Sequence, residues 1–225
     1  MEIVYKSRNA VVINKPEGMP SQHDKTLSDD AISALSRTLS DMGERAEVYP
    51  VHRLDRVVGG LMVLARNKKS AAALSALVGS EGVGKEYLAV CDGAVNEPCE
   101  MRDHLSKVAN QNVSRVSRFA TRDTKEAVMY CEPLALVNTE KGEKTLLKIT
   151  LKTGRFHQIR AQLSSRGLSI TGDKKYGSRD FGTRNIALYS CRISFTLDSE
   201  KIEASSLPDI EKYPWCLFSK DKYKI

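Results

Sequence analysis

The segment that most constrains the fold is residues 51–66, where a charged loop leads directly into an apolar strand. One acid, Asp55, stands between Arg53 and Arg56. Two glycines follow, and then comes the run Leu-Met-Val-Leu-Ala, whose length is typical of a strand. A carboxylate close to guanidinium groups is expected to stay ionised, because the opposite charge lowers its pKa. Asp55 is therefore a candidate nucleophile. The alternative is a salt-bridged surface loop.

Local patterns predict a mixture of helices and strands. Alternating or apolar runs indicate strands over residues 3–7, 10–14, 85–90, 125–137, 144–152, 186–197 and 201–205. Apolar spacing indicates a helix from about Leu27 to Met42, capped by Thr26 or Ser28. Further helices are expected over residues 68–78 and up to about residue 166, where Gly167 ends the last one. For the polar residues 93–123 we expect short strands and exposed loops.

Composition excludes several classes of protein. With 225 residues and 41% hydrophobic content, the chain can build one domain of two lobes. No apolar run approaches the roughly 18 residues of a membrane span, and the N-terminus lacks a signal-peptide pattern. The five cysteines are widely spaced without a Cys-x-x-Cys pair, and the four histidines lie far apart. We therefore expect neither a disulfide framework nor a metal site, but a cytoplasmic monomer without a membrane partner.

Positive charge is concentrated in one part of the chain. The net charge is +7. Residues 148–192 contain ten Lys or Arg and two acids, whereas residues 24–47 contain six acids and three bases. A segregated basic region is typical of proteins that contact phosphates. The charge pattern predicts a polyanionic partner, with an ordinary solvated surface as the alternative.

Four sequence motifs occur in a fixed order. They are His-Arg-Leu-Asp at 52–55 with Gly-Leu five residues later, Lys-x-Tyr-x-Ala at 85–89, Thr-Gly-Arg-x-His-Gln-Ile-Arg at 153–160 and Gly-Asp-x-x-Tyr-Gly at 172–177. Together they resemble the RluA-type pseudouridine synthases, which isomerise uridine to pseudouridine in ribosomal or transfer RNA. An Asn-Lys-Pro-x-Gly turn at 14–18 adds to the resemblance, which extends from about residue 3 to 200.

The resemblance implies an α+β fold with a mixed, mostly antiparallel sheet and a cleft centred on Asp55. It also implies one catalytic domain over 1–225, without an N-terminal RNA-binding appendage. Asp55 would attack C1′ or C6 of the uridine, or act through a glycal. Arg155 would pair with Asp55 and keep it ionised, and Tyr87 would stack on the base and help to remove the C5 proton.

Further residues are expected at the RNA, whose target nucleotide must leave the helix. Candidate substrate-binding residues are Arg53, His52, Lys85, His157, Gln158, Arg160 and Leu188, the last as an apolar floor under the base. The reaction breaks one C–N bond and forms one C–C bond without redox change or added group, so it requires no cofactor. The polar residues 93–123 are expected to select the substrate, although the sequence does not indicate which RNA or uridine is modified.

One departure from the family pattern leaves alternatives open. The chain has Val58-Gly59 where the family usually has Thr-Ser. An RNA-binding protein of the same fold without catalysis is therefore one alternative. A glycosidase is another, but it needs two carboxylates, and the nearest second acid is Asp173 in a turn. A non-enzymatic basic adaptor would leave the order of the motifs unexplained.

Overall fold

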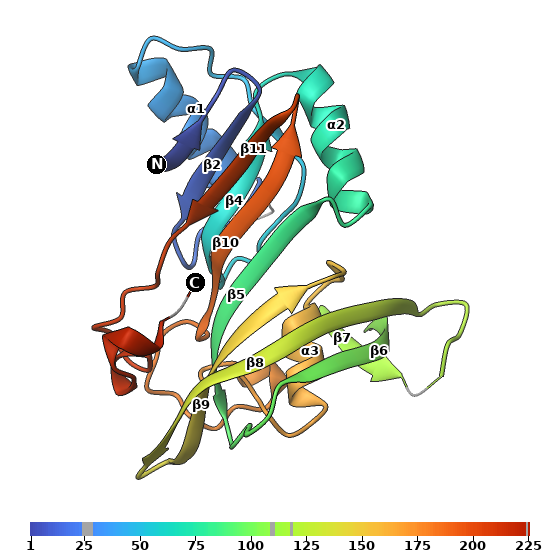
Figure 1. Ribbon diagram of the computed structural model, residues 1–225, viewed down its shortest axis with the longest axis vertical. Coiled ribbons are helices and arrows are strands. Elements are labelled where there is room, and N and C mark those ends of the chain that lie inside the picture. Colours follow the sequence, from blue (N-terminus) through green and yellow to red (C-terminus); the bar gives the residue numbers. More distant parts are fainter. Residues whose placement is uncertain (24–28, 109–110, 118, 224) are drawn as a thin grey trace. The chain divides into compact units, whose positions relative to one another are not determined.

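The computed structural model describes residues 1–23, 29–108, 111–117, 119–223 and 225, which form an α+β chain (Figure 1). The chain builds two compact units. The first contains residues 1–85 and 190–208, and the second contains residues 86–189 and 209–225. Two of the three boundaries fall inside strands, β5 (Val83–Asp92) and β10 (Leu188–Leu197). That the two units act as one domain stays a prediction.

The first unit is built on a sheet whose strands follow the order β1-β2-β4-β10-β11, with β3 paired to β4. The pairs β1–β2, β2–β4, β3–β4 and β10–β11 are antiparallel. Besides β10, the strands are β1 (Glu2–Lys6), β2 (Ala10–Lys15), β3 (Tyr49–Pro50), β4 (Gly59–Ala65) and β11 (Glu200–Ser205). The strands predicted at both ends of the chain are thus confirmed within two residues.

Helix α1 (Ala31–Asp41) starts later than predicted. Its N-cap is Asp30, whose carboxylate accepts hydrogen bonds from the backbone N–H groups of Ile32 at 3.0 Å and Ser33 at 3.1 Å. A short carboxylate at this position satisfies two of the unpaired N–H groups of the first turn. The predicted cap at Thr26 or Ser28 was therefore wrong, and residues 24–28 themselves lie outside the described residues.

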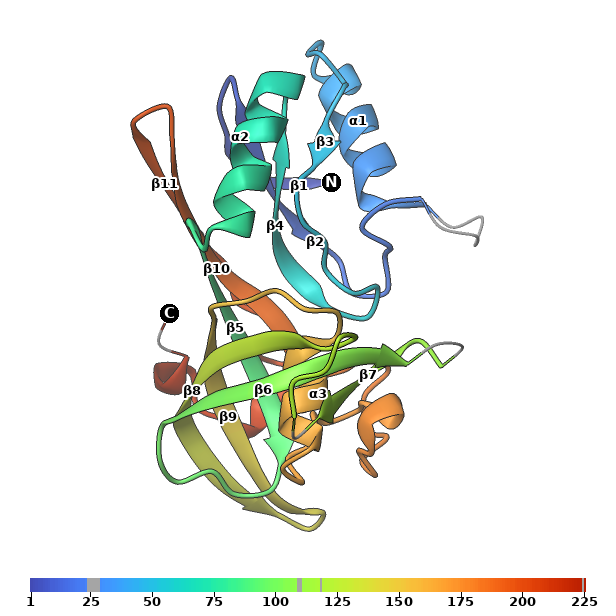
Figure 2. The same cartoon turned by 90° about the vertical axis from the view of Figure 1, so that its right-hand side faces the viewer.

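The core of the first unit explains why the sequence of β4 has no polar side chain. All seven of its residues are buried, which requires cover on both faces, because successive side chains point to opposite sides. On one face, Leu74 of α2 (Lys68–Gly79) belongs to the same core cluster as Leu61 and Val63 of β4 and Phe195 of β10. Figure 2 shows α1 and α2 on either side of β4.

The second unit contains a sheet with the strand order β5-β9-β8-β6-β7. Besides β5, the strands are β6 (Cys99–Val108), β7 (Val113–Ser117), β8 (Lys125–Thr139) and β9 (Gly142–Leu151). The register of β8 shifts between Pro133 and Ala135, because proline has no backbone N–H to donate to the neighbouring strand. Strand β6 is longer than expected. Its two buried residues, Met101 and Leu105, lie on the same face of the strand, and the polar residues Arg102 and His104 lie on the opposite face.

One short helix, α3 (Gln158–Ser164), supports this sheet. Its Ala161 packs with Leu105 of β6, Ala127 of β8 and Tyr176, which lies in the 3-10 helix η1 (Lys174–Tyr176). The C-terminal segment adds two further 3-10 turns, η2 (Trp215–Leu217) and η3 (Lys220–Lys222). In the described part of the chain, the helices are too short or too polar to cross a membrane.

Candidate active site

Asp55 lies in the loop between β3 and β4, where the neighbouring residue is fixed by a serine. Ser21 Oγ donates to the carbonyl of Leu54 at 2.7 Å and accepts from its N–H at 3.0 Å. The carbonyl of Asp55 accepts from the N–H of Val58 at 3.0 Å, which closes a turn. Asp55 itself is half-buried. The backbone on both sides of the carboxylate is therefore held in place.

The N-terminal turn at residues 15–18 supports the other side of the Asp55 loop. The carbonyl of Arg56 accepts hydrogen bonds from Gly18 N at 2.8 Å and Lys15 Nζ at 3.4 Å. In return, Arg56 Nε donates to the carbonyl of Gly18 at 2.9 Å. Three hydrogen bonds thus join two segments that are almost 40 residues apart in sequence.

Lys15 is a buried residue whose role the sequence did not reveal. Its Nζ also donates to the carbonyls of Pro16 at 3.0 Å and Met19 at 2.8 Å, and the side chain is fully buried. Burial lowers the pKa of Lys15 to about 8, although the charges of Glu17 and Asp55 oppose this shift. The Asn-Lys-Pro-x-Gly turn was the only signal for Lys15, and Ser21 had no sequence signal.

His52 and Gly60 attach the loop to the sheet. His52 Nε2 accepts from the backbone N–H of Val63 at 3.0 Å, so this imidazole is neutral. Burial, followed by the charge of Lys85, lowers the pKa of His52 to about 4. Gly60 has φ +108°, and a Cβ there would lie 2.3 Å from the carbonyl oxygen of Ser190. Only glycine allows this approach.

In the second unit, Gln158 fixes the segment that carries Arg155. Gln158 Oε1 accepts from Thr153 Oγ1 at 2.8 Å and from the N–H of Arg155 at 3.0 Å. Its Nε2 donates to the carbonyl of Val128 at 3.1 Å. Arg155 is exposed, and its Nε donates to the carbonyl of Glu126 at 2.8 Å. The conformation of this arginine is therefore set by two neighbouring segments.

Four side chains link the Thr-Gly-Arg-x-His-Gln-Ile-Arg motif to the Gly-Asp-x-x-Tyr-Gly motif. Arg160 donates to Asp173 through Nε at 2.7 Å and Nη2 at 2.8 Å, and Arg160 Nη1 lies 3.1 Å from His157 Nε2. Because a guanidinium can only donate, His157 Nε2 accepts and Nδ1–H donates to the Tyr176 hydroxyl at 3.0 Å. Burial, with help from Arg160, lowers the pKa of His157 to about 3. The ring is thus held neutral.

This arrangement corrects one expectation. Gln158 is 3% and Arg160 is 4% exposed, and both side chains bond to protein groups. They turn inward because α3 is covered by β6, β7 and η1. Neither side chain is therefore placed to contact RNA directly.

The other predicted residues divide between the two units. Arg53 is exposed in the first unit, where Lys85 is 6% exposed. In the second unit, Tyr87 in the middle of β5 is 7% exposed, and Leu188, the first residue of β10, is 3% exposed. Because Asp55 and Arg155 belong to different units, their pairing stays a prediction. Within the described ranges, His, Cys, Asp and Glu form no group of three that could hold a metal ion.

Comparison with known proteins identifies the family. A family model described as RNA pseudouridylate synthase matches residues 9–165, which include the Asp55 loop and the Thr-Gly-Arg-x-His-Gln-Ile-Arg motif. The chain belongs to this family. The predicted resemblance and the predicted enzyme class, an isomerase that converts uridine to pseudouridine in RNA, are thereby confirmed.

Individual relatives agree with this assignment. The chain is 30% identical to "Ribosomal large subunit pseudouridine synthase D" of Zymomonas mobilis over 79% of its length, but spans only 56% of that relative. It is 27% identical to "tRNA pseudouridine synthase C" of Vibrio vulnificus over 98% of its length and 95% of that protein. The solved structure "Human RNA Pseudouridylate Synthase Domain Containing 1" has the same fold, with a TM-score of 0.79, 20% identity and coverage of 95% and 85%.

Proposed function

We propose that this synthase modifies a uridine in transfer or ribosomal RNA, with Asp55 as the nucleophile. The observation that carries the proposal is the support of the Asp55 loop, which Ser21, Gly18 and Lys15 hold through backbone groups on both sides of the carboxylate. A held carboxylate can act at a sugar carbon or a uracil carbon without a cofactor. The named functions of the relatives supply the two classes of RNA.

The proposed steps leave the elemental composition of the nucleotide unchanged. The C1′–N1 bond breaks, the uracil rotates, and C1′ bonds to C5. The C5 proton leaves and N1 acquires a proton. Asp55 attacks C1′ or C6, or else acts as the base at C2′ on the route through a glycal. Arg155 approaches Asp55 in the working enzyme and stabilises its negative charge.

Tyr87 and Leu188 are proposed to hold the flipped-out base, and Arg53 to brace the vacated position in the RNA. Tyr87 stacks on the uracil, and its hydroxyl is a candidate acceptor of the C5 proton. Leu188 supplies an apolar surface beside the ring. We also propose that the protein works in the cytoplasm as a monomer, where its five cysteines stay reduced thiols.

The deciding experiment measures tritium release. Transfer RNA and ribosomal RNA, each labelled with tritium at uridine C5, are incubated with wild-type protein and with Asp55→Asn. We expect release from one class by the wild type and none by the variant, whose melting temperature should stay close to wild type. Equal release by Asp55→Asn would refute the role of Asp55. Absence of release from both classes, with RNA binding intact, would favour the alternative of an RNA-binding protein without catalysis. The departure from the family pattern at Val58-Gly59 is the reason for considering this alternative.

A further inference from the structure

The loop of residues 172–185 has two faces of different character. Its two acids, Asp173 and Asp180, are buried, as are Tyr176 and Ser178. Its four cations, Lys174, Lys175, Arg179 and Arg184, are all exposed. The negative charges are therefore neutralised inside the protein, and the outward side of the loop is positively charged.

Hydrogen bonds fix the middle of this loop. Ser178 Oγ donates to Asp92 Oδ2 at 2.8 Å, and Asp92 Oδ1 accepts from Lys144 Nζ at 2.8 Å. Lys144 is 1% exposed, and its Nζ also lies 2.9 Å from Asp180 Oδ2. Breaking such a buried network is costly, because a charge would be left unpaired.

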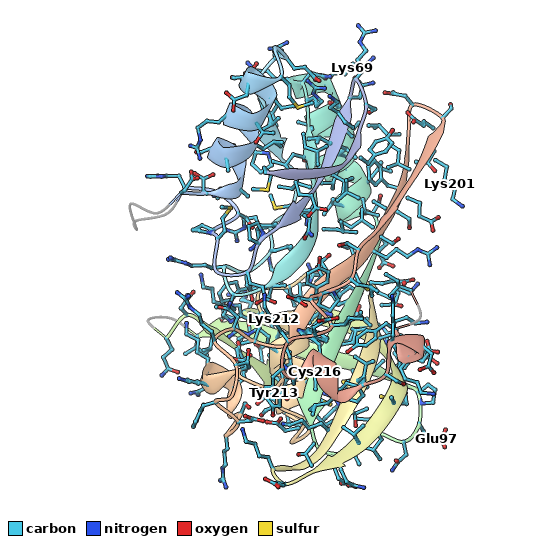
Figure 3. All side chains as sticks on the ribbon, turned by 90° about the vertical axis from the view of Figure 1, so that its left-hand side faces the viewer. Lys69, Glu97, Lys201, Lys212, Tyr213 and Cys216 are labelled. Carbon is cyan, nitrogen blue, oxygen red and sulfur yellow. The ribbon has the colours of Figure 1, made fainter. Side chains whose placement is uncertain are left out.

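The same network fixes the residues next to Phe181. Asp180 Oδ1 accepts from Lys141 Nζ at 2.9 Å and from the N–H of Gly182 at 2.9 Å. The hydroxyl of Tyr213, labelled in Figure 3, donates to Asp180 Oδ2. These contacts lower the pKa of Asp180 below its ordinary range, despite burial. The residues before and after Phe181 are therefore held in place.

Phe181 nevertheless points outward. It is 61% exposed, whereas most large apolar side chains of the chain are buried. The ammonium of Lys174 lies 4.9 Å from the centre of its ring. An exposed aromatic ring beside a cation, on a loop that is already ordered and carries further exposed cations, matches the way proteins bind unpaired nucleotides. The ring stacks on a base, and the cations contact the phosphates.

We propose that residues 174–184 form a binding surface for unpaired RNA, in which Phe181 stacks on a base and Lys174 and Arg179 contact neighbouring phosphates. The surface lies outside the residues assigned to the reaction. The proposal rests on the proposed function, since it concerns how the substrate RNA is held. Because Phe181 carries no base-specific group, the surface would select for single-stranded structure rather than for sequence.

The test measures binding of two probes that the enzyme cannot modify, because they lack uridine. One is a single-stranded oligoribonucleotide of alternating adenosine and cytidine, and the other is a duplex of guanosine and cytidine. We expect Phe181→Ala and Phe181→Leu to weaken binding of the single strand about tenfold, and Phe181→Trp to retain it. The duplex should bind all four proteins with similar affinity.

Salt dependence separates stacking from charge. Phe181→Ala should leave the slope of log Kd against log salt concentration unchanged. Arg179→Gln should remove one phosphate contact and so reduce this slope by roughly 0.7, the value for one contact with a single strand. Tyr130→Ala, which removes another exposed aromatic residue from β8, is the matched control and should bind like wild type.

Three outcomes would overturn the proposal. They are wild-type binding by Phe181→Leu, loss of binding by Phe181→Trp equal to that by Phe181→Ala, and equal losses on the single strand and the duplex. If residues 174–184 do not form such a binding surface, the wild-type enzyme should still release tritium. Failure of the proposed function removes tritium release but leaves the Phe181 dependence of binding, so the two failures are distinguishable.

Discussion

Arg160 and Asp173 form a buried ion pair through two parallel hydrogen bonds of 2.7 and 2.8 Å. Arg160 is the last residue of the Thr-Gly-Arg-x-His-Gln-Ile-Arg motif, and Asp173 is the second residue of the Gly-Asp-x-x-Tyr-Gly motif. The pair explains why the two motifs occur together. Arg160 of the earlier motif holds Asp173, which lies near the start of the loop of residues 172–185.

Replacing Asp173 by Asn should destabilise the protein by about 3–5 kcal/mol, because the Arg160 charge would stay buried without its partner. Urea denaturation measures this loss. The matched control is Arg166→Gln, which removes a partly exposed pair with Asp103 and should cost less than about 1 kcal/mol. Similar losses in the two variants would mean that the buried pair has no special role.

Acid should destabilise the protein through His157. Its pKa is about 3 in the folded chain and 6.5 when unfolded, so its contribution to stability is complete above pH 6.5 and is lost as the pH falls toward 3. At pH 5 the loss should reach about 2 kcal/mol. Urea denaturation between pH 7 and 5 should show a smaller decline for His157→Asn than for wild type. An identical decline would contradict the prediction, and His23→Asn, at an exposed site, is the control.

Gly60→Ala should lower stability by about 2–4 kcal/mol, since its methyl group would collide with the Ser190 carbonyl in an unfavourable backbone conformation. Gly43→Ala separates the two causes, because Gly43 has φ +72° but no atom within 4 Å of a built Cβ. It should cost about 1–2 kcal/mol. Comparable melting temperatures for the two variants would contradict this prediction, because they would show that the backbone at Ser190 moves away from the added methyl group at little cost.

Ser21→Ala should slow the reaction without abolishing it. The variant loses both hydrogen bonds to Leu54, and the Asp55 carboxylate becomes less well positioned. A misplacement of about 1 Å costs up to a hundredfold in rate, so kcat for tritium release should fall about tenfold to a hundredfold while KM changes little. Ser21→Thr keeps the hydroxyl and should restore part of the rate. An increase in KM with an unchanged kcat would contradict a positioning role.

The sequence by itself determined the family, most of the strands along the chain and the identity of the candidate nucleophile. These depend on local signals. Period-two alternation specified β9, and short motifs with fixed spacing marked Asp55 and Arg155. The start of α1 was placed too early, because Asp30 competes with other polar residues as a cap and only the folded chain shows which one reaches the free N–H groups.

Only the tertiary structure decided what the polar residues of these motifs do. Gln158 and Arg160 could have been surface residues or RNA contacts, yet both are buried. Lys15 and Ser21 carry no sequence pattern that predicts a partner, and they hold a loop more than 30 residues away. The physical reason is that a buried hydrogen bond joins groups that are close in space, and sequence spacing does not report that distance.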